Sequence, residues 1–109
     1  RVAGGSAAVD TAQSWTTASD LRLKKDIVSL GGTLAKVDRL RGIRFHALEE
    51  KASDPVHIGF VAQELEKEFP EVVLTDDKGY KSVAYDKLTP ILLEAIKELK
   101  AEIEVLKKK

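Results

Sequence analysis

A serine and a lysine near the start of the charge-rich part of the chain have a spacing that could support covalent chemistry. Ser19 precedes Lys24 by five residues, within the stretch SDLRLKK at 19–25. A serine hydroxyl becomes a nucleophile when a neighbouring base takes its proton, and lysine is the base in one variant of this arrangement. The lysine must be uncharged to do so, a state that burial or nearby cations favour. Arg22 and Lys25 supply such cations, so one interpretation of this stretch is a Ser–Lys dyad.

The alternative interpretation of the same stretch is an ordinary helix start. Ser19 or Asp20 is a suitable N-cap, and Lys24 would then be a solvated residue of the helix. Residues five apart point to different faces of a regular helix. The two side chains can therefore meet only if Ser19 lies outside the helix at its cap, or if they come from different chains of an oligomer. Spacing alone favours the cap.

The other residues that could do chemistry show weaker patterns. His46 and His57 have no carboxylate at a telling spacing, and we interpret them as surface or strand-face side chains. The two aspartates at 76–77 stand in a TDDKG context, which predicts a solvated turn. Gln63 and Glu64 follow an apolar stretch at a predicted helix start, where a glutamate is electrostatically favoured.

Composition argues against several classes of function. The 109 residues include 18 Lys+Arg and 18 Asp+Glu, so the formal net charge is zero. This balance argues against nucleic acid or an anionic membrane as the main partner. The chain has no cysteine, no HExxH spacing and no Gly-rich phosphate loop, so we expect no metal site and no cofactor. No apolar run approaches the roughly 18 residues that span a bilayer.

The pattern along the chain predicts one small α+β domain that follows a change in composition. Residues 1–18 are small and polar apart from Trp15, which indicates either a flexible lead-in or the end of an upstream domain. From Ser19 to Leu40, apolar residues recur every three or four positions. That spacing predicts two short helices joined by a bend at the glycines 31–32.

The middle of the chain predicts short strands around one brief helix. Alternation at 42–48 predicts a half-buried strand, and the apolar residues around Gly59 predict a second short strand or a close backbone approach. A brief helix is predicted over 62–69, where a proline follows. The segments 72–74 and 80–84 are predicted to pair as a β-hairpin.

The C-terminal part, from about residue 86, is predicted to form one long helix. Its large apolar residues alternate spacings of four and three, as in a coiled-coil seam with Ile at a and Leu at d. The seam residues are Leu92, Ile96, Leu99, Ile103 and Leu106. Ile at a with Leu at d favours two strands, although two heptads are a short basis for strand number. The other interpretation is an amphipathic helix that packs on its own domain.

Three blocks of the sequence, in this order, resemble a known family. SDLRLKKDI at 19–27 is similar to the Ser-Asp-x-Arg-x-Lys-x-x-Ile opening of the intramolecular chaperone auto-processing domain, also called the peptidase S74 family. That domain ends many phage tail spikes and tail fibres. IGFVAQELEKEFPEVV at 58–73 resembles the second signature of the family, and SVAYDKLTPILLEAIKEL at 82–99 resembles its third block. The resemblance covers about 19–109.

The resemblance implies a C-terminal chaperone that forms a homotrimer through a parallel coiled coil. It would direct the folding of an upstream trimeric, β-rich tail fibre or spike of the same chain. The chaperone would then release itself by autoproteolysis between Ala18 and Ser19, with Ser19 as nucleophile and Lys24 as general base. Residues 1–18 would be the end of the passenger and 19–109 the released domain. The motif-supporting residues that the resemblance implies are Asp20, Arg22, Gln63 and Glu64.

The resemblance also implies a phage tail protein made in the bacterial host cytoplasm, whose chaperone fragment is absent from the mature virion. The expected partners are the other copies and the passenger, with no nucleic acid and no membrane. The chain begins at Arg1 without a methionine, so we expect it to be part of a longer protein. One rival is a non-catalytic trimerisation or attachment module, in which Ser19 is only a cap. A small transcription-regulatory coiled coil is a third, less favoured candidate.

Overall fold

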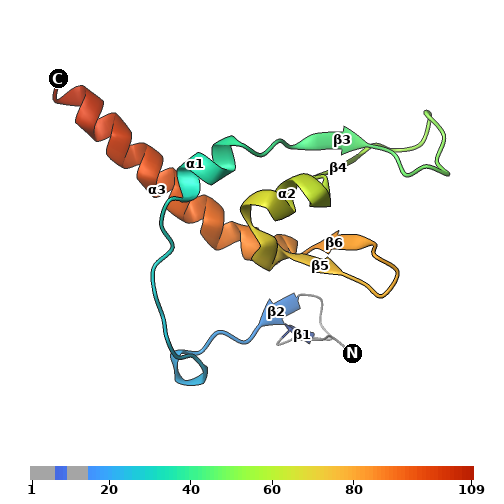
Figure 1. Cartoon of the computed structure of the whole chain (residues 1–109), viewed down its shortest axis with the longest axis horizontal. Coiled ribbons are helices and arrows are strands. Elements are labelled where there is room, and N and C mark those ends of the chain that lie inside the picture. Colours follow the sequence, from blue (N-terminus) through green and yellow to red (C-terminus); the bar gives the residue numbers. More distant parts are fainter. Residues whose placement is uncertain (1–6, 10–14) are drawn as a thin grey trace.

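Short helices, small antiparallel hairpins and one long terminal helix make up the described part of the chain. The computed structural model describes the backbone of residues 7–9 and 15–109. In chain order the elements are β1 (Ala7–Val9), β2 (Trp15–Thr17), the 3₁₀ turn η1 (Leu21–Leu23), α1 (Thr33–Asp38), β3 (Ile43–Phe45), β4 (His57–Gly59), α2 (Ala62–Glu68), the 3₁₀ turn η2 (Pro70–Val72), β5 (Val73–Thr75), β6 (Lys81–Val83), the 3₁₀ turn η3 (Tyr85–Lys87) and α3 (Leu88–Lys107) (Figure 1). The predicted α+β class, with a long C-terminal helix, is confirmed.

Each sheet among the described residues is a two-stranded antiparallel hairpin, formed by β1–β2, β3–β4 and β5–β6. The β5–β6 turn shows how the sequence fixes such a hairpin. Asp76 Oδ1 accepts the backbone N–H groups of Lys78 and Tyr80, each at 2.9 Å. Gly79 has a φ of +88°, a conformation that glycine adopts without the penalty of a side chain. The predicted hairpin and its turn are therefore confirmed.

The core lies where α2, η2 and β5 meet the first half of α3. Leu65 is fully buried on the inner face of α2, and Phe69 is buried just beyond the end of that helix, as the predicted helix over 62–69 requires. The buried hydrophobic cluster consists of Leu65, Phe69, Val72, Val73, Leu88 and Ile91. Six buried residues are a small core for a domain of about 100 residues. A chain of this size gains most of its stability from buried apolar surface, so this core gives the single chain only modest stability.

A carboxylate of α3 caps α1, which was not predicted from the sequence. The N-cap residue of α1 is Gly32, with a φ of +66° and no side chain to offer. Glu98 of α3 accepts hydrogen bonds from the Thr33 backbone N–H at 3.0 Å, the Thr33 hydroxyl at 2.8 Å and the Leu34 N–H at 3.3 Å. Thr33 is 1% exposed, so this contact closes one end of the α1–α3 interface.

Only the second of the two helices predicted between residues 19 and 40 forms. The segment between η1 and α1 contains neither helix nor strand, and Asp26 in it has a φ of +56°, which interrupts a right-handed helix. Ile27, Val28 and Leu30 are exposed on this segment. Helices in proteins gain most of their stability from packing an apolar face. The prediction was wrong because one chain offers this stripe no surface to pack on.

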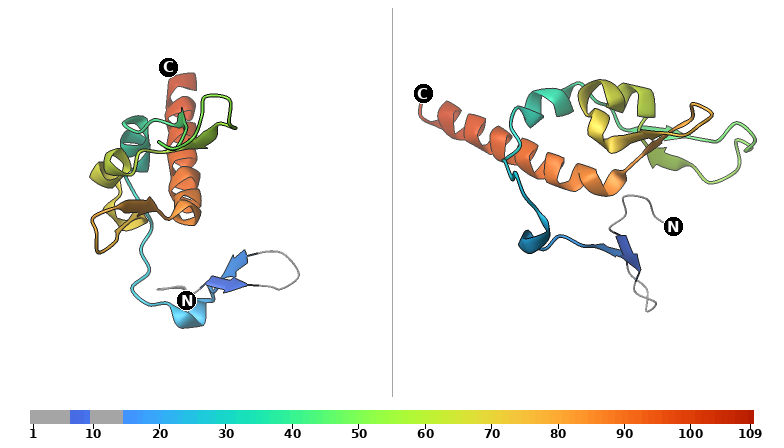
Figure 2. Two further views of the ribbon diagram at one scale, coloured as in Figure 1. Left: turned by 90° about the vertical axis from the view of Figure 1, so that its right-hand side faces the viewer. Right: turned by 60° about the horizontal axis from the view of Figure 1, so that its bottom comes forward.

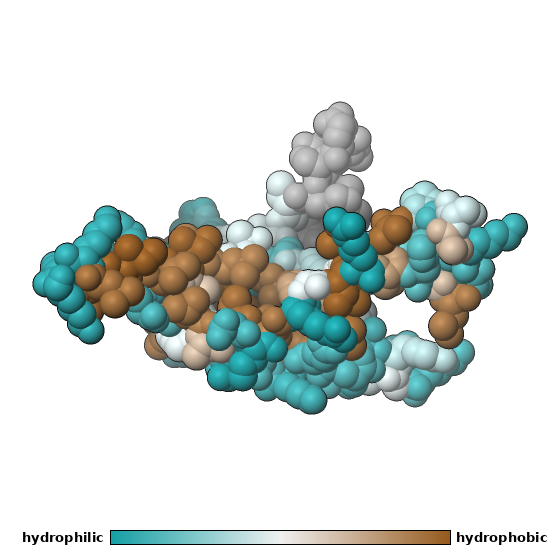
Figure 3. Space-filling model, turned by 90° about the horizontal axis from the view of Figure 1, so that it is seen from above, coloured by the Kyte–Doolittle hydropathy of each residue, from teal (hydrophilic) through white to brown (hydrophobic). Residues whose placement is uncertain are grey.

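The molecule is extended, with the N-terminal hairpin and η1 placed apart from the main body (Figures 1 and 2). The Cα radius of gyration is 17.4 Å, whereas a compact domain of this length has about 13 Å. Among the described side chains, 19 large hydrophobic residues are exposed and seven hydrophobic residues are buried. Figure 3 shows hydrophobic side chains along α3 toward its C-terminal end. The single chain therefore leaves unusually much apolar surface in contact with water.

Candidate active site

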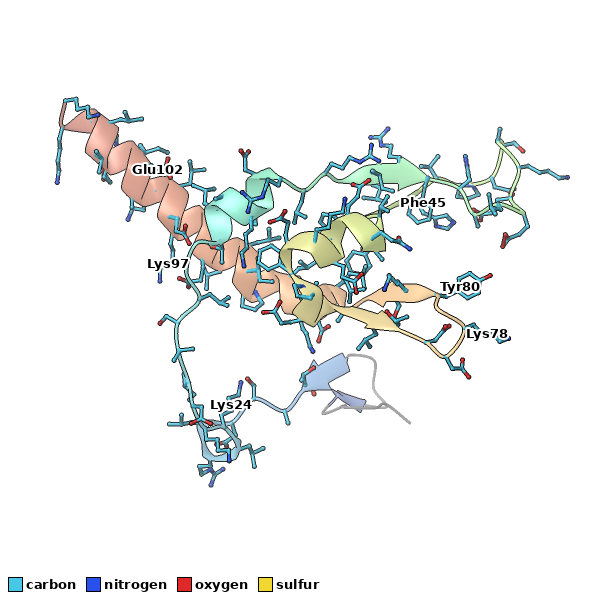
Figure 4. All side chains as sticks on the ribbon, in the orientation of Figure 1. Lys24, Phe45, Lys78, Tyr80, Lys97 and Glu102 are labelled. Atoms are coloured by element: carbon cyan, nitrogen blue, oxygen red, sulfur yellow. The ribbon has the colours of Figure 1, made fainter. Side chains whose placement is uncertain are left out.

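The 3₁₀ turn η1 brings Ser19 and Lys24 together. Ser19 lies between β2 and η1, and Lys24 is the C-cap of η1, with extended dihedral angles of −120° and 150°. Lys24 Nζ donates a hydrogen bond to Ser19 Oγ at 2.7 Å. Figure 4 places Lys24 on this small turn, away from the hairpins β3–β4 and β5–β6 and from the long helix. The two side chains meet because Ser19 stands outside the turn, which is the condition that the sequence argument set.

Local hydrogen bonds explain why the backbone turns here. Asp20, and not Ser19, is the N-cap, and its Oδ1 accepts the Arg22 N–H at 2.8 Å. The Leu23 N–H donates to the Asp20 carbonyl at 2.9 Å, and the Lys24 N–H donates to the Leu21 carbonyl at 3.1 Å. One turn of 3₁₀ helix therefore lies between Ser19 and Lys24, and the chain becomes extended directly after it.

A charged pair braces the same turn from outside. The guanidinium of Arg22 binds both carboxylate oxygens of Asp20, through Nε at 3.1 Å and Nη2 at 2.8 Å. Hydrogen bonds from the Arg22 side chain, and then from its backbone, lower the pKa of Asp20 below its usual value. The same contact raises the pKa of Arg22 above its usual value. Both side chains are exposed, so the pair contributes more to geometry than to stability.

The turn η1 and the chain on both sides of it are exposed to solvent, because every residue from Thr16 to Gly32 is exposed. Leu21 is 71% exposed and Leu23 is 74% exposed, so the two large apolar side chains of η1 cover nothing in the single chain. Ala18 lies directly between the end of β2 and the start of the turn, and the peptide bond that joins it to Ser19 is accessible. The Ser19 hydroxyl thus lies in an exposed segment, with the Lys24 side-chain nitrogen as its hydrogen-bond partner.

Gln63 and Glu64 lie on the main body, in the first turn of α2, apart from η1 (Figures 1 and 2). Glu64 does not cap its own helix. Its two oxygens accept hydrogen bonds from Arg41 Nε and Nη2, each at 2.9 Å, and this contact lowers the pKa of Glu64. The pair links α2 to the segment after α1. Gln63 lines a surface hollow together with Phe60 and Tyr85.

The helix α3 carries two adjacent apolar stripes, one buried and one exposed. Leu88, Ile91 and Ala95 face the domain and are buried. The five seam residues at the a and d positions are Leu92, Ile96, Leu99, Ile103 and Leu106, and all of them are exposed. The helix therefore packs on its own domain through a different stripe from the predicted seam. The interpretation that the seam serves only packing within the domain does not account for this arrangement.

The two histidines hold the loop between β3 and β4. His57 Nε2 lies 3.0 Å from both oxygens of Glu50, and His46 Nε2 lies 2.9 Å from the Asp54 carbonyl oxygen. The contact with Glu50 was missed from the sequence, because Glu50 reaches back across the loop rather than along a regular element. Within residues 7–9 and 15–109, no three potential metal ligands gather, and no helix is long and apolar enough to cross a membrane.

Comparisons with known proteins find a family match over the first two of the three sequence blocks, together with similar phage proteins. A family model described as chaperone of endosialidase, peptidase S74, matches residues 19–74. The chain is 33% identical over 97 residues to the long tail fibre protein Gp37 of Enterobacteria phage K3, which covers 84% of this chain and 8% of the phage protein. It is also 33% identical to Gp37 of phage T2, over 84% of this chain and 7% of that protein. For Gp37 of phage M1, the identity is 32% over 82% of this chain and 38% of that protein.

Proposed function

The chain belongs to the peptidase S74 family of endosialidase chaperones, and from that premise we propose that it is a self-cleaving intramolecular chaperone of a phage tail fibre or spike. It assembles as a homotrimer, aligns three copies of an upstream β-rich passenger, and then cuts itself off between Ala18 and Ser19. The observation that carries the proposal is the 2.7 Å hydrogen bond between Lys24 Nζ and Ser19 Oγ.

The proposed cleavage uses groups that are already adjacent. Lys24 Nζ, once uncharged, takes the hydroxyl proton of Ser19, and Ser19 Oγ bonds to the carbonyl carbon of Ala18. The C–N bond of that peptide breaks, the freed Ser19 nitrogen takes the proton from Lys24, and an ester joins Ala18 to Oγ. Water then hydrolyses the ester, which leaves a carboxylate on Ala18 and restores the hydroxyl. Each catalytic group returns to its starting state.

The position of the proposed cut is supported by the local structure. β2 ends at Thr17 and the 3₁₀ turn begins at Leu21, so the cut would fall between two elements and break neither. The family match begins at Ser19 itself. The hairpin β1–β2 precedes the cut and would remain with the passenger. Residues 1–18 are accordingly proposed as passenger end and 19–109 as chaperone.

Assembly through α3 is supported by the exposed seam. An exposed stripe of Ile and Leu at a and d positions is unfavourable in water and becomes buried when parallel copies associate. A self-associating module at the end of a chain raises the local concentration of the passenger ends and sets their register. Long β-rich shafts need such help, since their non-local pairing is slow and their edges aggregate. Cleavage afterwards prevents the reverse process.

Assembly has a second proposed role, which is to desolvate the dyad. Lys24 already contacts Ser19 in a single chain, so correct distance is not what the oligomer has to supply. The oligomer would instead supply burial, because an ammonium group loses its proton more readily when it is removed from water. The exposed side chains of Leu21, Leu23 and Ile27 flank Lys24 and would be covered by a neighbouring copy. Cleavage would then follow assembly, in the order that a chaperone requires.

The test is expression of a longer chain that carries its natural upstream segment. Intact mass should reveal a fragment that begins at Ser19. The variants Ser19→Ala and Lys24→Ala should abolish it, because one removes the nucleophile and the other the base. Lys25→Ala is the matched control, since it removes a neighbouring exposed lysine but neither the nucleophile nor the proposed base; it should still give the fragment, at a rate lowered only by the loss of one nearby cation. Cleavage that persists in both Ser19→Ala and Lys24→Ala would reject the dyad. Loss in Lys25→Ala alone would move the base to Lys25.

A non-catalytic trimerisation module is the second candidate. It is favoured by the direction of the observed hydrogen bond, in which Lys24 donates to Ser19 as a contact that simply braces the turn would do. That module would give a stable oligomer and no fragment from the longer chain. Sedimentation should show three copies in either case, and a stable dimer would overturn the proposed trimer.

A further inference from the structure

The carboxylate nearest to the proposed nucleophile is already occupied by an arginine. Asp20 directly follows Ser19, and Arg22 contacts Asp20 Oδ1 at 3.1 Å and Asp20 Oδ2 at 2.8 Å. Among the described residues, no carboxylate lies within ion-pair distance of Lys24. The turn therefore has two cations that could pair with Asp20, and Arg22 is the one that does.

The choice of cation matters because the competitor is the proposed base. A planar guanidinium binds both oxygens of a carboxylate, whereas an ammonium acts as a point charge. Arg22 therefore holds Asp20 in a geometry that a lysine cannot match. If Asp20 were free, its negative charge would attract the Lys24 ammonium away from Ser19 and keep the proton on it.

We propose that Arg22 is a positioning residue, which engages Asp20 so that Lys24 remains on Ser19 and can give up its proton. This inference rests on the proposed function of the dyad and adds a role for a charge that does not itself touch the reacting atoms. The charged groups of the turn and its flanks, from residue 16 to 28, are Asp20, Arg22, Lys24, Lys25 and Asp26. η1 stands apart from the helices and the other two hairpins of the described chain (Figures 1 and 2), so among the described residues the other four set the field at Lys24.

The chain offers a clean way to separate charge from shape. Asparagine caps helical turns as well as aspartate does, so Asp20→Asn keeps an acceptor for the Arg22 N–H while it removes the charge and the oxygen that accepts from Arg22 Nη2. Arg22→Gln keeps a polar side chain of similar reach and removes the guanidinium. The double variant removes both charges together. These three chains and the wild type form a cycle in which each step changes one charge.

The measurement is the first-order rate of self-cleavage as a function of pH, in the longer chain. The wild-type rate should rise with pH as the base loses its proton. Arg22→Gln should displace this rise to higher pH, with about a tenfold lower rate at neutral pH for a displacement of about one unit. Asp20→Asn should displace it to lower pH, because Arg22 is then an unpaired cation near Lys24. The double variant should return close to the wild-type profile.

Two outcomes would overturn the role of Arg22 in positioning Lys24. One is that Arg22→Gln lowers the self-cleavage rate without displacing its pH profile; the other is that the double variant cleaves no faster at neutral pH than Arg22→Gln alone. Either result would mean that Arg22 only supports the fold of the turn. Arg22→Lys should give an intermediate displacement, since it restores the charge without the fork. Should Arg22→Gln fail to assemble, Asp20→Asn decides alone, because its cap is intact. If the wild-type chain cleaves without needing Ser19, the proposed function fails first; if it needs Ser19 but its profile ignores these charges, only this inference fails.

Discussion

At the scale of single residues, Gly59 occupies a position that no other residue fits well. A Cβ at this position would collide with the Tyr85 hydroxyl, and that hydroxyl accepts a hydrogen bond from the Phe60 N–H at 3.1 Å. The sequence had predicted either a strand or a close backbone approach around Gly59, and both occur. Gly59→Ala should push the Tyr85 ring aside and break this hydrogen bond. We expect a loss of about 1–2 kcal/mol in the free energy of unfolding, measured by urea denaturation.

Gly42→Ala is the matched control for this prediction. Gly42 stands just before the same hairpin and has no positive φ, and a Cβ added there would meet no heavy atom within 4 Å. Alanine there should be neutral or slightly stabilising, by up to about 1 kcal/mol, because it restricts the unfolded chain. Equal losses in the two variants would mean that glycine flexibility, and not the contact with Tyr85, explains the effect.

At the scale of elements, the contact of Glu98 with the start of α1 predicts a pH-dependent attachment of that helix. Hydrogen bonds from the Thr33 hydroxyl, the Thr33 N–H and the Leu34 N–H lower the pKa of Glu98 below its usual value of 4.5. A carboxylate with a lowered pKa in the folded state stabilises the fold at pH above its unfolded value. That contribution is lost as the pH falls through the lower, folded value. Acid should therefore loosen α1 before the core unfolds.

Glu98→Gln tests this link between the two helices. At neutral pH the variant should be less stable than the wild type, because the amide nitrogen is a donor and cannot accept the Leu34 N–H. The difference should shrink as the pH falls below the usual carboxyl pKa and through the lower, folded pKa of Glu98, because the wild-type carboxyl then becomes protonated as well. Urea unfolding at fixed protein concentration, repeated across pH, measures it. Glu102→Gln removes a carboxylate one turn further along the exposed helix and should show no such trend. A constant difference for Glu98→Gln would contradict the prediction.

How much of the fold could be predicted depended on where each element finds its partner. The helix over 62–69 and the hairpin around residues 76–79 were predicted because a local apolar face and a local turn specify them. The helix predicted before Gly31 does not form, since the periodicity of Ile27 and Leu30 says nothing about what will cover these residues. Likewise the cap from Glu98 joins residues 65 positions apart, and no local pattern announces it.

The candidate site followed the same rule. The sequence predicted that Ser19 and Lys24 could meet if Ser19 lay outside the helical turn. This condition could be stated in advance because only one turn of the chain separates the two residues. The identity of the N-cap was left open between Ser19 and Asp20, and only the geometry assigned it to Asp20. The pairing of Glu64 with Arg41 depends on how α1 and α2 lie together, so the sequence could not reveal it. The roles of these residues in cleavage stay predictions.

At the scale of the whole molecule, the exposed stripe on α3 and the exposed turn at Ser19 suggest one cooperative event. The seam residue Ile96 is 64% exposed and Leu99 is 46% exposed, so charged replacements there should leave the folded single chain intact. They should prevent association, because burying the two charged side chains in the seam would remove them from water, which is costly for charges of either sign. If assembly desolvates Lys24, a chain that cannot associate should not cleave.

The double variant Ile96→Glu with Leu99→Lys, in the longer chain, tests this coupling. We expect a monomer by sedimentation, retained helical circular dichroism, and a cleavage rate at least about a hundredfold below wild type, as expected when the proton transfer to a base is lost. The control places the same two side chains on the far side of the helix, as Lys97→Glu with Ala101→Lys, and should assemble and cleave normally. A monomer that cleaves at the wild-type rate would show that the turn alone suffices and that assembly only orders the passenger. A variant that still trimerises would instead place the interface outside the seam, on the exposed apolar residues around η1.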